Sequence, residues 1–414
     1  MPEVEIHKAQ SLDGLPRRAA AIAPGRTAIR SGARLISYAE LDAAVDAFAV
    51  ALSALRSGAV VGVTAALHPA FPIAYYGAVR GGHVCAVVDP RLPEDVLYDT
   101  LERAGVEILV ATAGMADALR RVRLDLRGLT DVIYLDQPGD HGAPTVAGLA
   151  RTHAGRRPRR RRPDPDAVAC LRFGLDAAGR PAAVPLTHRN LTAGAAQAAR
   201  VYRFDAGSTV VNHLPAYDPV YLDAAVRATA TQVLCAEPDP AEGLAMAARE
   251  GATHYCGPPA GLARLAADPR GTRARMPAVR AVFSTGSTLD PAAATRVARR
   301  VGAPFVQWYG HPAAPLTHCD RLDRPTAGSV GRPVPGTDCR VVDVDGRHPA
   351  PPGRPGEVRV RGPQVATAAT DPDGWLRTGD MGYVDDDGTL FLVGRLDDDR
   401  VRPGRLVSPA GVVR

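Results

Sequence analysis

Short apolar runs alternate with helical segments in the first part of the chain, and this alternation restricts the possible folds more than any other feature. The runs AVVGVTAAL (59–67), HVCAVVD (83–89) and VEILVAT (106–112) have the length and composition of buried strands. Segments of helical character lie between them, over 69–82 and 92–105, and each ends in glycine. Strands separated by helices are typical of a largely parallel sheet covered by helices, so we predict an α/β fold.

A capping box introduces the first long helix, which we expect within residues 35–56. Ser37 is followed three residues later by Glu40, the spacing at which each side chain can bond the backbone N–H of the other residue. Apolar residues then recur at helical spacing, namely Leu41, Ala44, Val45, Phe48, Leu52 and Leu55. This pattern predicts a helix with one buried face.

The alternation resumes beyond residue 167, which predicts a second α/β layer. We expect strands at 209–215, 231–237, 279–286 and 304–310, helices at 221–230, 240–250 and 290–301, and a turn at 253–259. From about Ser329, short strands are instead separated by Asp-Gly and Pro-Gly turns, which indicates a small antiparallel barrel. The predicted division is a first α/β subdomain at 1–155, an Arg/Pro-rich linker at 156–166, a second α/β subdomain at 167–325 and a barrel at 326–394.

The apolar runs and the cysteines indicate in which cellular compartment the protein is expected. No apolar run approaches the ~18 residues that a membrane span requires, and the first residues, MPEVEIHKAQ, lack the apolar core of a secretory signal. The cysteines form no C-x-x-C pair and are scattered at Cys85, Cys170, Cys235, Cys256, Cys319 and Cys339. We therefore expect a cytoplasmic protein with reduced thiols, no membrane partner, no disulfide framework and no metal cage.

The formal net charge of +6 is concentrated in one place. Residues 156–162, RRPRRRR, contain six arginines, and these account for the whole net charge. The basic character is thus a local run and not a binding face. We expect a solvated linker and no nucleic-acid partner, with an anionic partner as the lesser alternative.

The stretch CLRFGLDAAGRPAAVPLTHRNL (170–191) predicts a short strand, a glycine-broken loop and a helix that Thr187 can cap. A loop that leads into a helix N-terminus favours anions, because unpaired N–H groups and the helix dipole point at it. Its residues, however, suit phosphate poorly, since a carboxylate stands where hydroxyl and ammonium groups would help. These residues are Leu175, Asp176, Ala177, Ala178, Gly179 and Ala182.

Several motifs, taken in order, resemble the adenylate-forming superfamily of acyl- and aryl-CoA synthetases, peptide-synthetase adenylation domains and luciferases. They are LISYAELD, VCAVVDPRLP, GRPAAVPLTHRNL, ATHYCGPP, FSTGS, WYGHP and DGWLRTGDMGYVDDDGTLFLVGRLDD. Their order and spacing run from about Ile36 to the C-terminus. The resemblance implies the large N-terminal domain of such enzymes, with two layered α/β subdomains and a small β-barrel.

The resemblance also implies a nucleotide site. Tyr309 would stack on adenine, Asp380 would accept hydrogen bonds from both ribose hydroxyls, and Arg395 would reach the ribose or the α-phosphate. The adenine pocket would further be lined by Ser284, Thr285, Gly286, Ser287 and Gly310, and the acyl pocket by His213, Tyr217, Tyr255 and Gly257. Taken singly, Tyr309 is better explained as a core aromatic residue and Asp380 as a turn residue, and it is the ordered context of the motifs that favours the nucleotide role.

The chain departs from the family pattern where the triphosphate and its metal would bind. The family's hydroxyl-rich, lysine-containing loop is replaced by the residues around Asp176, whose charge would repel polyphosphate. The family's Thr-Glu becomes Pro312-Ala313, so the carboxylate expected to hold Mg²⁺ is missing. Lys8 is the only lysine, and the family's mobile lid is expected to be truncated, with Asp397 as its hinge and 395–414 as hinge and remnant.

These features predict a diverged acyl-/aryl-CoA ligase-like protein that binds AMP or an acyl-adenylate. ATP could also bind, but adenylation of a small carboxylate would be impaired, because the groups that neutralise charge at the α-phosphate are replaced. CoA binding and the acyl substrate are not assigned. Two alternatives stay open. The first is a working acid–thiol ligase that works with a separate lid domain or a carrier protein. The second is a non-catalytic scaffold.

Overall fold

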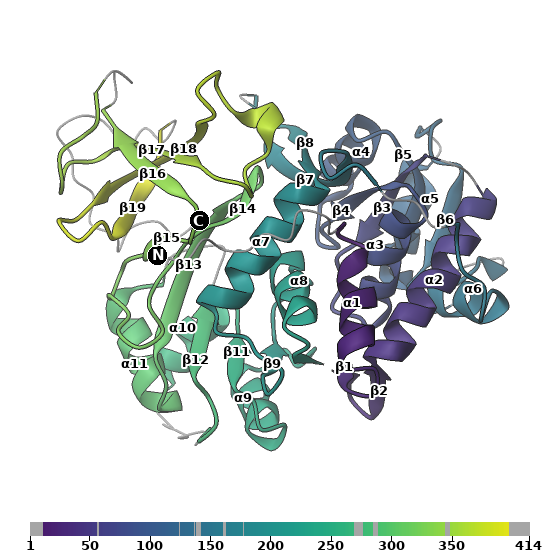
Figure 1. Cartoon of the computed structure of the whole chain (residues 1–414), viewed down its shortest axis with the longest axis horizontal. Helices are drawn as coiled ribbons and strands as arrows, with labels where there is room; N and C mark the ends of the chain where they lie inside the picture. Colours follow the sequence, from purple (N-terminus) through teal and green to yellow (C-terminus); the bar gives the residue numbers. More distant parts are fainter. Residues whose placement is uncertain are drawn as a thin grey trace. The chain divides into compact units, whose positions relative to one another are not determined.

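The computed structural model describes residues 11–55, 58–123, 125–135, 137, 142–159, 163–176, 178–268, 276–284, 289–343 and 348–396. These residues form two compact units (Figure 1). Of the described residues, the N unit contains those from Ser11 to Ala195 together with Pro215–Leu234. The C unit contains Ala196–Leu214 and the chain from Cys235 onward. The Asp397 hinge and the segment 397–414 lie outside the described residues.

The N unit is built on a six-stranded sheet with the order β6-β5-β3-β4-β7-β8. Its strands are β3 (Val60–Thr64), β4 (Val84–Val88), β5 (Val106–Ala111), β6 (Asp131–Tyr134), β7 (Val168–Leu175) and β8 (Pro181–Thr187). The strands pair in parallel except for β7 and β8, which form an antiparallel hairpin at one edge. The structure therefore confirms the α/β fold with a largely parallel sheet.

Helices connect these strands, as the periodicity predicts. They are α1 (Gly14–Ile22), α2 (Tyr38–Leu55), α3 (Ala70–Arg80), α4 (Glu94–Arg103), α5 (Ala116–Val122), α6 (Val146–Thr152) and α8 (Pro219–Arg227), with a 3-10 turn at Ala113–Met115. Helix α7 (His188–Val201) begins in the N unit and continues past Ala195. The capping box before α2 is confirmed, because Glu40 Oε2 accepts from Ser37 N at 2.7 Å and Glu40 N donates to Ser37 Oγ at 3.2 Å.

The expected boundary at 156–166 differs from the observed division. The parallel pairing of β7 with β4 places Cys170 opposite Cys85, so the first sheet extends beyond this segment. The N unit also contains a second group of strands, β1 (Thr27–Ser31), β2 (Arg34–Ser37) and β10 (Thr231–Leu234). The described part of the Arg/Pro-rich segment, 156–159 and 163–166, is thus mostly exposed and lies within the N unit and not at its border.

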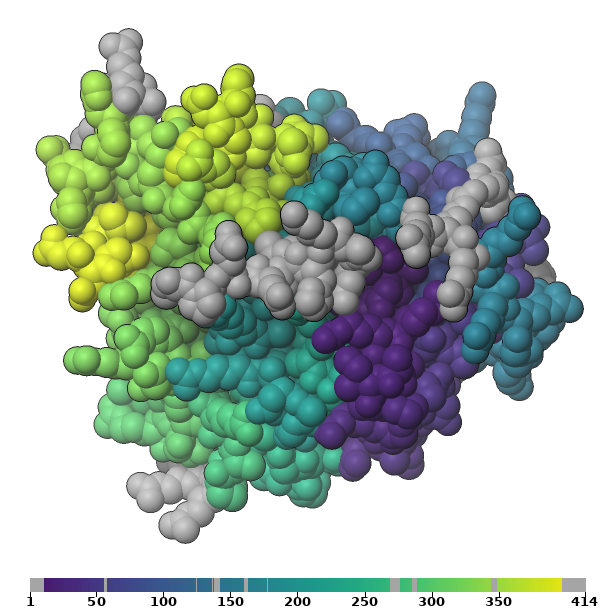
Figure 2. Space-filling view, in the orientation of Figure 1, coloured from purple at the N-terminus to yellow at the C-terminus, as the bar shows by residue number. Residues whose placement is uncertain are grey.

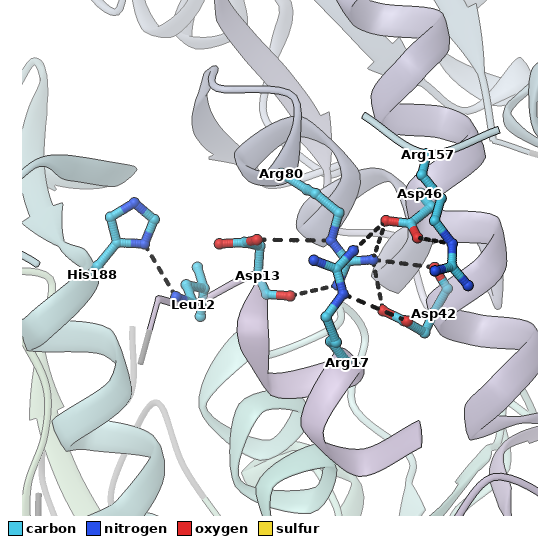
Figure 3. Close-up of polar contacts among 8 residues, drawn as sticks. All are labelled: Leu12, Asp13, Arg17, Asp42, Asp46, Arg80, Arg157 and His188. Atoms are coloured by element: carbon cyan, nitrogen blue, oxygen red, sulfur yellow. Dashed lines mark hydrogen bonds and ion pairs between the residues drawn. The ribbon is translucent and has the colours of Figure 1, made fainter. Parts of the chain in front are cut away.

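A network of ion pairs ties together the helices of the N unit (Figure 3). The Arg80 side chain is 2% exposed, and its Nη1 lies 2.6 Å from Asp42 Oδ1 and 2.9 Å from Asp46 Oδ1. Arg17 also reaches Asp46, at 2.6 Å, and Arg157 of the Arg-rich segment approaches it at 3.8 Å. Buried charges are tolerated when they are paired in this way, so α1, α2 and α3 are fixed to one another.

The C unit contains a mostly parallel sheet with the order β15-β14-β13-β12-β11-β9. Its strands are β9 (Thr209–Asn212), β11 (His254–Cys256), β12 (Ala281–Ser284), β13 (Phe305–His311), β14 (Ala314–Cys319) and β15 (Arg332–Pro333), and its helices are α9 (Pro240–Arg249), α10 (Pro259–Ala267) and α11 (Pro291–Val301). The turn predicted at 253–259 is wrong, because residues 254–256 form a fully buried strand paired with β9 and β12. Its three-residue length carries no detectable periodicity.

An antiparallel sheet completes the C unit, with the order β16-β17-β18-β19. Its strands are β16 (Asp338–Val342), β17 (Gly356–Arg361), β18 (Leu376–Val384) and β19 (Leu390–Arg395), with a 3-10 turn at Thr367–Ala369. Figure 2 shows residues of this region, coloured yellow-green to yellow, grouped on the surface. The described part of the expected barrel is thus a four-stranded sheet. None of the described helices is long and apolar enough to cross a membrane.

Candidate nucleotide-binding site

Tyr309 and Asp380 meet although they are 71 positions apart in the chain. The Tyr309 hydroxyl donates to Oδ2 of Asp380 at 2.5 Å, and the tyrosine is only 7% exposed. Burial, followed by the charge of Asp380, raises the pKa of Tyr309 well above its ordinary value. The phenol therefore stays protonated and acts as a donor, which leaves the second carboxylate oxygen of Asp380 available for other groups.

Arg395 approaches that second oxygen from the neighbouring strand. Asp380 on β18 and Arg395 on β19 are direct partners in the antiparallel register, and Arg395 Nη1 lies 3.7 Å from Asp380 Oδ1. The arginine side chain is 62% exposed, so its guanidinium group is open to solvent. Thr378 Oγ1 accepts the N–H of Asp380 at 3.1 Å and fixes the backbone there. The carboxylate thus has fixed geometry and a cation beside it.

Strand β13 requires a glycine directly after Tyr309. A Cβ atom at position 310 would lie 2.1 Å from the backbone oxygen of Pro315, so only glycine fits between β13 and β14. A bulge between Tyr309 and His311 then shifts the register.

His311 belongs to the same cluster, although the sequence analysis did not select it. Burial lowers its pKa, Asp380 acts to raise it and Arg395 to lower it, so the charges of both residues reach this ring. Its Nδ1 accepts the N–H of Ala313 at 3.1 Å. The signal that could have found His311 is its position two residues after Tyr309 on the same strand.

Ser284 ends β12, beside β13, and is 1% exposed. Its hydroxyl is buried and has no hydrogen-bond partner within the described part of the chain. An unpaired buried hydroxyl is costly in a folded protein, and a polar ligand can relieve that cost. The other residues expected at this edge, Thr285, Gly286 and Ser287, lie outside the described residues.

The stretch expected to carry phosphates is a β-hairpin in the N unit (Figure 1). The loop was predicted to lead directly into a helix, which is wrong, because the seven residues of β8 separate the turn from α7. The predicted Thr187 cap is confirmed, since Asn190 N donates to Thr187 Oγ1 at 3.2 Å. The N-terminus of α7 is therefore not part of this loop. Two prolines and a run of small residues without alternation obscured the strand character of β8.

The hairpin turn folds around the Asp176 side chain. Its Oδ1 accepts the N–H groups of Ala178 and Arg180, both at 2.9 Å, and its backbone oxygen accepts that of Gly179 at 2.9 Å. Leu175 beside it is 72% exposed, and Ala182 belongs to β8. Ala177 lies outside the described residues. The carboxylate is thus directed toward its own turn.

The segment that resembles a magnesium motif does not fit a divalent cation. Pro312 and Ala313 have no side-chain oxygen, and the backbone oxygen of Ala313 already accepts the N–H of Ala366 at 2.7 Å. Within the described ranges there is no group of three or more histidine, cysteine, aspartate or glutamate side chains that could hold a metal ion. Carboxylate and water oxygens are the usual ligands of Mg²⁺, so no step is assigned to this ion.

Three of the four residues expected at the acyl pocket belong to the C unit. His213 Nδ1 is 2.5 Å from the hydroxyl of Tyr255, and its Nε2 contacts the backbone oxygen of Glu237. The His213 ring packs so closely on α9 that a Cβ atom at Gly243 would lie 2.3 Å from it. Gly257 is buried, and a Cβ there would lie 2.9 Å from the Tyr255 ring.

Tyr217, the fourth of these residues, belongs to the N unit. Its hydroxyl donates to Gln232 Oε1 at 3.0 Å, and its ring stacks on Phe71 with the centroids 5.0 Å apart. The structure therefore brings His213, Tyr255 and Gly257 together on neighbouring strands, whereas Tyr217 packs into the core of the other unit.

Comparison with known proteins identifies relatives along nearly the whole chain. A family model described as AMP-binding enzyme matches residues 16–368. A feruloyl-CoA synthase from Amycolatopsis sp. is 29% identical, over 97% of this chain and 82% of that protein. An indoleacetate–CoA ligase from Aromatoleum aromaticum is 28% identical, over 95% of this chain and 80% of that protein.

Solved structures share the fold. The anthranilate CoA ligase AuaEII in complex with anthranoyl-AMP has a TM-score of 0.86 at 18% identity, covering 96% of this chain and 80% of that one. ATP-bound MatB from Rhodopseudomonas palustris has a TM-score of 0.82 at 23% identity, covering 94% and 80%. At these identities the likeness shows the fold alone.

Proposed function

The chain belongs to the family of AMP-binding enzymes and has relatives among the acyl- and aryl-CoA ligases, and from this premise we propose that it binds the AMP portion of an acyl-adenylate. The observation that carries the proposal is the cluster of Tyr309, Asp380 and Arg395 in the C unit. Their three chemistries correspond to the parts of AMP: a flat ring, a diol and a phosphate.

Asp380 is the centre of this proposed site. One carboxylate can accept hydrogen bonds from two adjacent hydroxyls, and ribose presents such a pair. Tyr309 and Thr378 hold the carboxylate in place by contacts of 2.5 Å to the side chain and 3.1 Å to the backbone. A fixed acceptor loses little entropy when a diol binds, which favours affinity.

Arg395 supplies the positive charge. Its exposed guanidinium group, 3.7 Å from Asp380, is free to turn toward a phosphate, and guanidinium–phosphate hydrogen bonds are among the stronger ones in proteins. The Ser284 hydroxyl, which has no hydrogen-bond partner among the described residues, offers a further polar contact at the end of β12, the strand that pairs with β13 and its Tyr309. These groups are sufficient for a nucleoside monophosphate.

We further propose that adenylation of a carboxylate from ATP is impaired in this chain. Ala178, Gly179 and Ala182 provide no hydroxyl for a polyphosphate, and Pro312-Ala313 provide no carboxylate for Mg²⁺. Adenylation requires neutralisation of charge that develops at the α-phosphate, and the residues named here do not supply it.

A working acyl- or aryl-CoA ligase is the second candidate function, because relatives named as ligases match nearly the whole chain. In that case a separate lid domain or a carrier protein would complete the reaction. The substrate would be a small carboxylate, and the reaction would be that of an acid–thiol ligase. A non-catalytic scaffold would require no nucleotide affinity at all.

Calorimetric titration of the full chain separates these functions. We expect AMP and a non-hydrolysable acyl-adenylate mimic to bind, and Mg-ATP to bind no more tightly than AMP. The matched control for replacing Asp380 of the cluster by asparagine is Asp387→Asn, because Asp387 is an 83% exposed carboxylate outside the cluster. Tight Mg-ATP binding with pyrophosphate release on addition of carboxylates would establish the working ligase instead, and no response to AMP would leave only the scaffold.

A further inference from the structure

A pocket in the C unit opens between helix α11, the first residues of β13 and the loop 320–329. Its volume is about 460 Å³, within the range of roughly 300–1,000 Å³ that is typical of sites for small organic molecules. None of Tyr309, Asp380 and Arg395 lines it. The pocket is therefore formed by other residues than the cluster proposed to bind AMP.

Asp320 fixes the loop that forms one wall of the pocket. Its Oδ2 accepts the N–H of Thr326 at 2.7 Å and the hydroxyl of Ser329 at 2.8 Å, and its Oδ1 accepts the N–H of Arg321 at 2.8 Å. Ser329 Oγ in turn accepts the N–H of Gly331 at 3.2 Å. The carboxylate is thus occupied by donors of its own loop, and the wall is in place before any ligand binds, which lowers the entropic cost of binding.

The lining that α11, β13 and the turn between them contribute is largely apolar, with one buried amide. Its apolar members are Ala294, Ala298, Ala303 and Phe305. Gln307 on β13 also lines the pocket and is 6% exposed, and its side-chain amide has no hydrogen-bond partner in the described part of the chain. A buried amide without a partner is costly, and a ligand with a hydroxyl group relieves that cost.

Arg299 adds a positive charge to the same pocket. It belongs to the last turn of α11 and is exposed, and its guanidinium group makes no ion pair with any residue that the structure describes. The next residue differs, because the Arg300 guanidinium lies 3.5 Å from Asp268 Oδ2. An unpaired guanidinium group beside apolar walls suits a ligand that carries a carboxylate.

We propose that this pocket is a second ligand site, which binds a small hydroxylated aromatic acid through Arg299, Phe305 and Gln307. The carboxylate pairs with Arg299, and the hydroxyl group bonds with the Gln307 amide. The ring is inferred from Phe305, because pairs of aromatic rings contribute more than the area that they bury. The site does not depend on whether the chain binds AMP.

The probe is 4-hydroxybenzoate, with benzoate and 4-hydroxybenzamide as comparison ligands. Benzoate lacks the hydroxyl group for Gln307, and the amide lacks the charge for Arg299. Calorimetric titration of the full chain is carried out with the acyl-adenylate mimic in excess, so that the proposed nucleotide site is filled. We expect 4-hydroxybenzoate to bind with a Kd below about 1 mM, and each comparison ligand to bind about three- to tenfold more weakly. Absence of saturable binding, equal affinity for all three ligands, or binding that the mimic abolishes would overturn the proposal.

Two arginine variants of α11 test the charge. Arg299→Gln and Arg296→Gln each remove an exposed charge from this helix, but Arg296 does not line the pocket. We expect Arg299→Gln to bind 4-hydroxybenzoate about three- to tenfold more weakly and Arg296→Gln to bind it as the wild type does. Equal losses in the two variants would show a general effect of charge and overturn the proposal.

Gln307→Leu tests the amide. The variant should lose the preference for 4-hydroxybenzoate over benzoate, while its thermal midpoint stays unchanged or rises, because an unpaired buried amide is removed. A preference that persists would overturn the contact with Gln307. The comparisons between variants remain decisive even if the acyl-adenylate mimic fails to bind, so failure of the proposed function and failure of this site are distinguishable.

Discussion

Asp380 and Arg395 face each other in register across β18 and β19, with the guanidinium group 3.7 Å from the carboxylate. The pair has opposite exposures, because the carboxylate is 16% exposed and the arginine 62%. A shielded acceptor beside an exposed cation suits a ligand that carries both hydroxyls and a negative charge. This relationship leads to the first two predictions.

Replacing Asp380 by asparagine should weaken AMP binding about 10- to 100-fold. The substitution keeps the size of the side chain but removes a charged acceptor, and hydrogen bonds to charged groups contribute roughly 1.5–3 kcal/mol. Calorimetric titration measures the loss, and adenosine titrated in parallel separates the ribose contact from the phosphate contact. A variant that binds AMP as tightly as wild type would remove Asp380 from the site.

Replacing Arg395 by glutamine should weaken AMP binding about tenfold and leave adenosine binding nearly unchanged, because the guanidinium group is proposed to contact the phosphate. The salt dependence of AMP affinity should also become shallower, since exposed charges are screened by salt. AMP titrations of the wild type and the variant at about 50 mM and about 500 mM salt measure this dependence. Equal losses for AMP and adenosine would contradict the phosphate contact.

Replacing Arg80 by methionine should lower the free energy of unfolding by about 3–5 kcal/mol, because the buried Asp46 and the partly buried Asp42 would lose their main counter-charge. Arg17→Met is the control, since Arg17 is 42% exposed and contributes to the same cluster from its surface. The control should cost below about 1 kcal/mol. Urea unfolding compares the two, and equal losses would show that Arg80 has no special role.

The carboxyl group of Asp223 is predicted to make a contribution to the free energy of unfolding that falls as the pH rises. Burial raises its pKa to about 7, although hydrogen bonds from Tyr76 at 2.7 Å and Tyr75 at 3.3 Å act in the opposite direction. An unfolded chain releases this proton near pH 4. Between about pH 4 and pH 7 the unfolded state therefore binds fewer protons than the folded state, and this group's contribution to stability falls as pH rises.

Asp223→Asn isolates that contribution, because its side chain does not titrate. We expect the free energy of unfolding of the wild type, relative to that of the variant, to decrease from about pH 4.5 to about pH 7.5. This interval covers most of the range between the two pKa values of Asp223, about 4 in the unfolded chain and about 7 in the folded protein. Urea unfolding at several pH values measures the difference. A difference that rises with pH would mean that Asp223 is ionised in the folded protein.

Local patterns in the sequence were enough to predict much of the fold. The strand 60–64 lies inside the predicted run 59–67, and α2 follows its capping box, because burial and capping leave direct marks on composition. Helix α11 likewise follows Asp290, whose side chain accepts from Ala293 N. Periodicity failed where strands are short or contain proline, as in β11 and β8.

The candidate site was less accessible to sequence reasoning. Tyr309 and Asp380 were identified by resemblance, but their direct hydrogen bond depends on how two sheets pack, which no local pattern encodes. The self-directed carboxylate of Asp176 was read as a charge facing a ligand, because the strand character of β8 was missed and with it the tight turn. Register and turn geometry are set by tertiary pairing.

Replacing Gly310 by alanine tests whether the close approach of β13 to β14 positions Tyr309. The added Cβ would lie 2.1 Å from the backbone oxygen of Pro315, a contact that no side-chain rotation can relieve. The strands must separate locally, which should cost about 1–3 kcal/mol of stability by overpacking and move Tyr309 away from Asp380. We therefore expect AMP affinity to fall at least about tenfold, by 1.4 kcal/mol or more.

The matched control is Gly25→Ala, since an added Cβ at Gly25 has no heavy atom within 4 Å. It should change neither the free energy of unfolding nor AMP affinity appreciably. Because a shift of β13 would separate the Tyr309 hydroxyl from Asp380, the loss of affinity in Gly310→Ala should be accompanied by a change in tyrosine absorbance. Unchanged AMP binding in a destabilised Gly310→Ala protein would mean that the close approach of the strands at Gly310 serves the fold alone and that Tyr309 is held by its own burial.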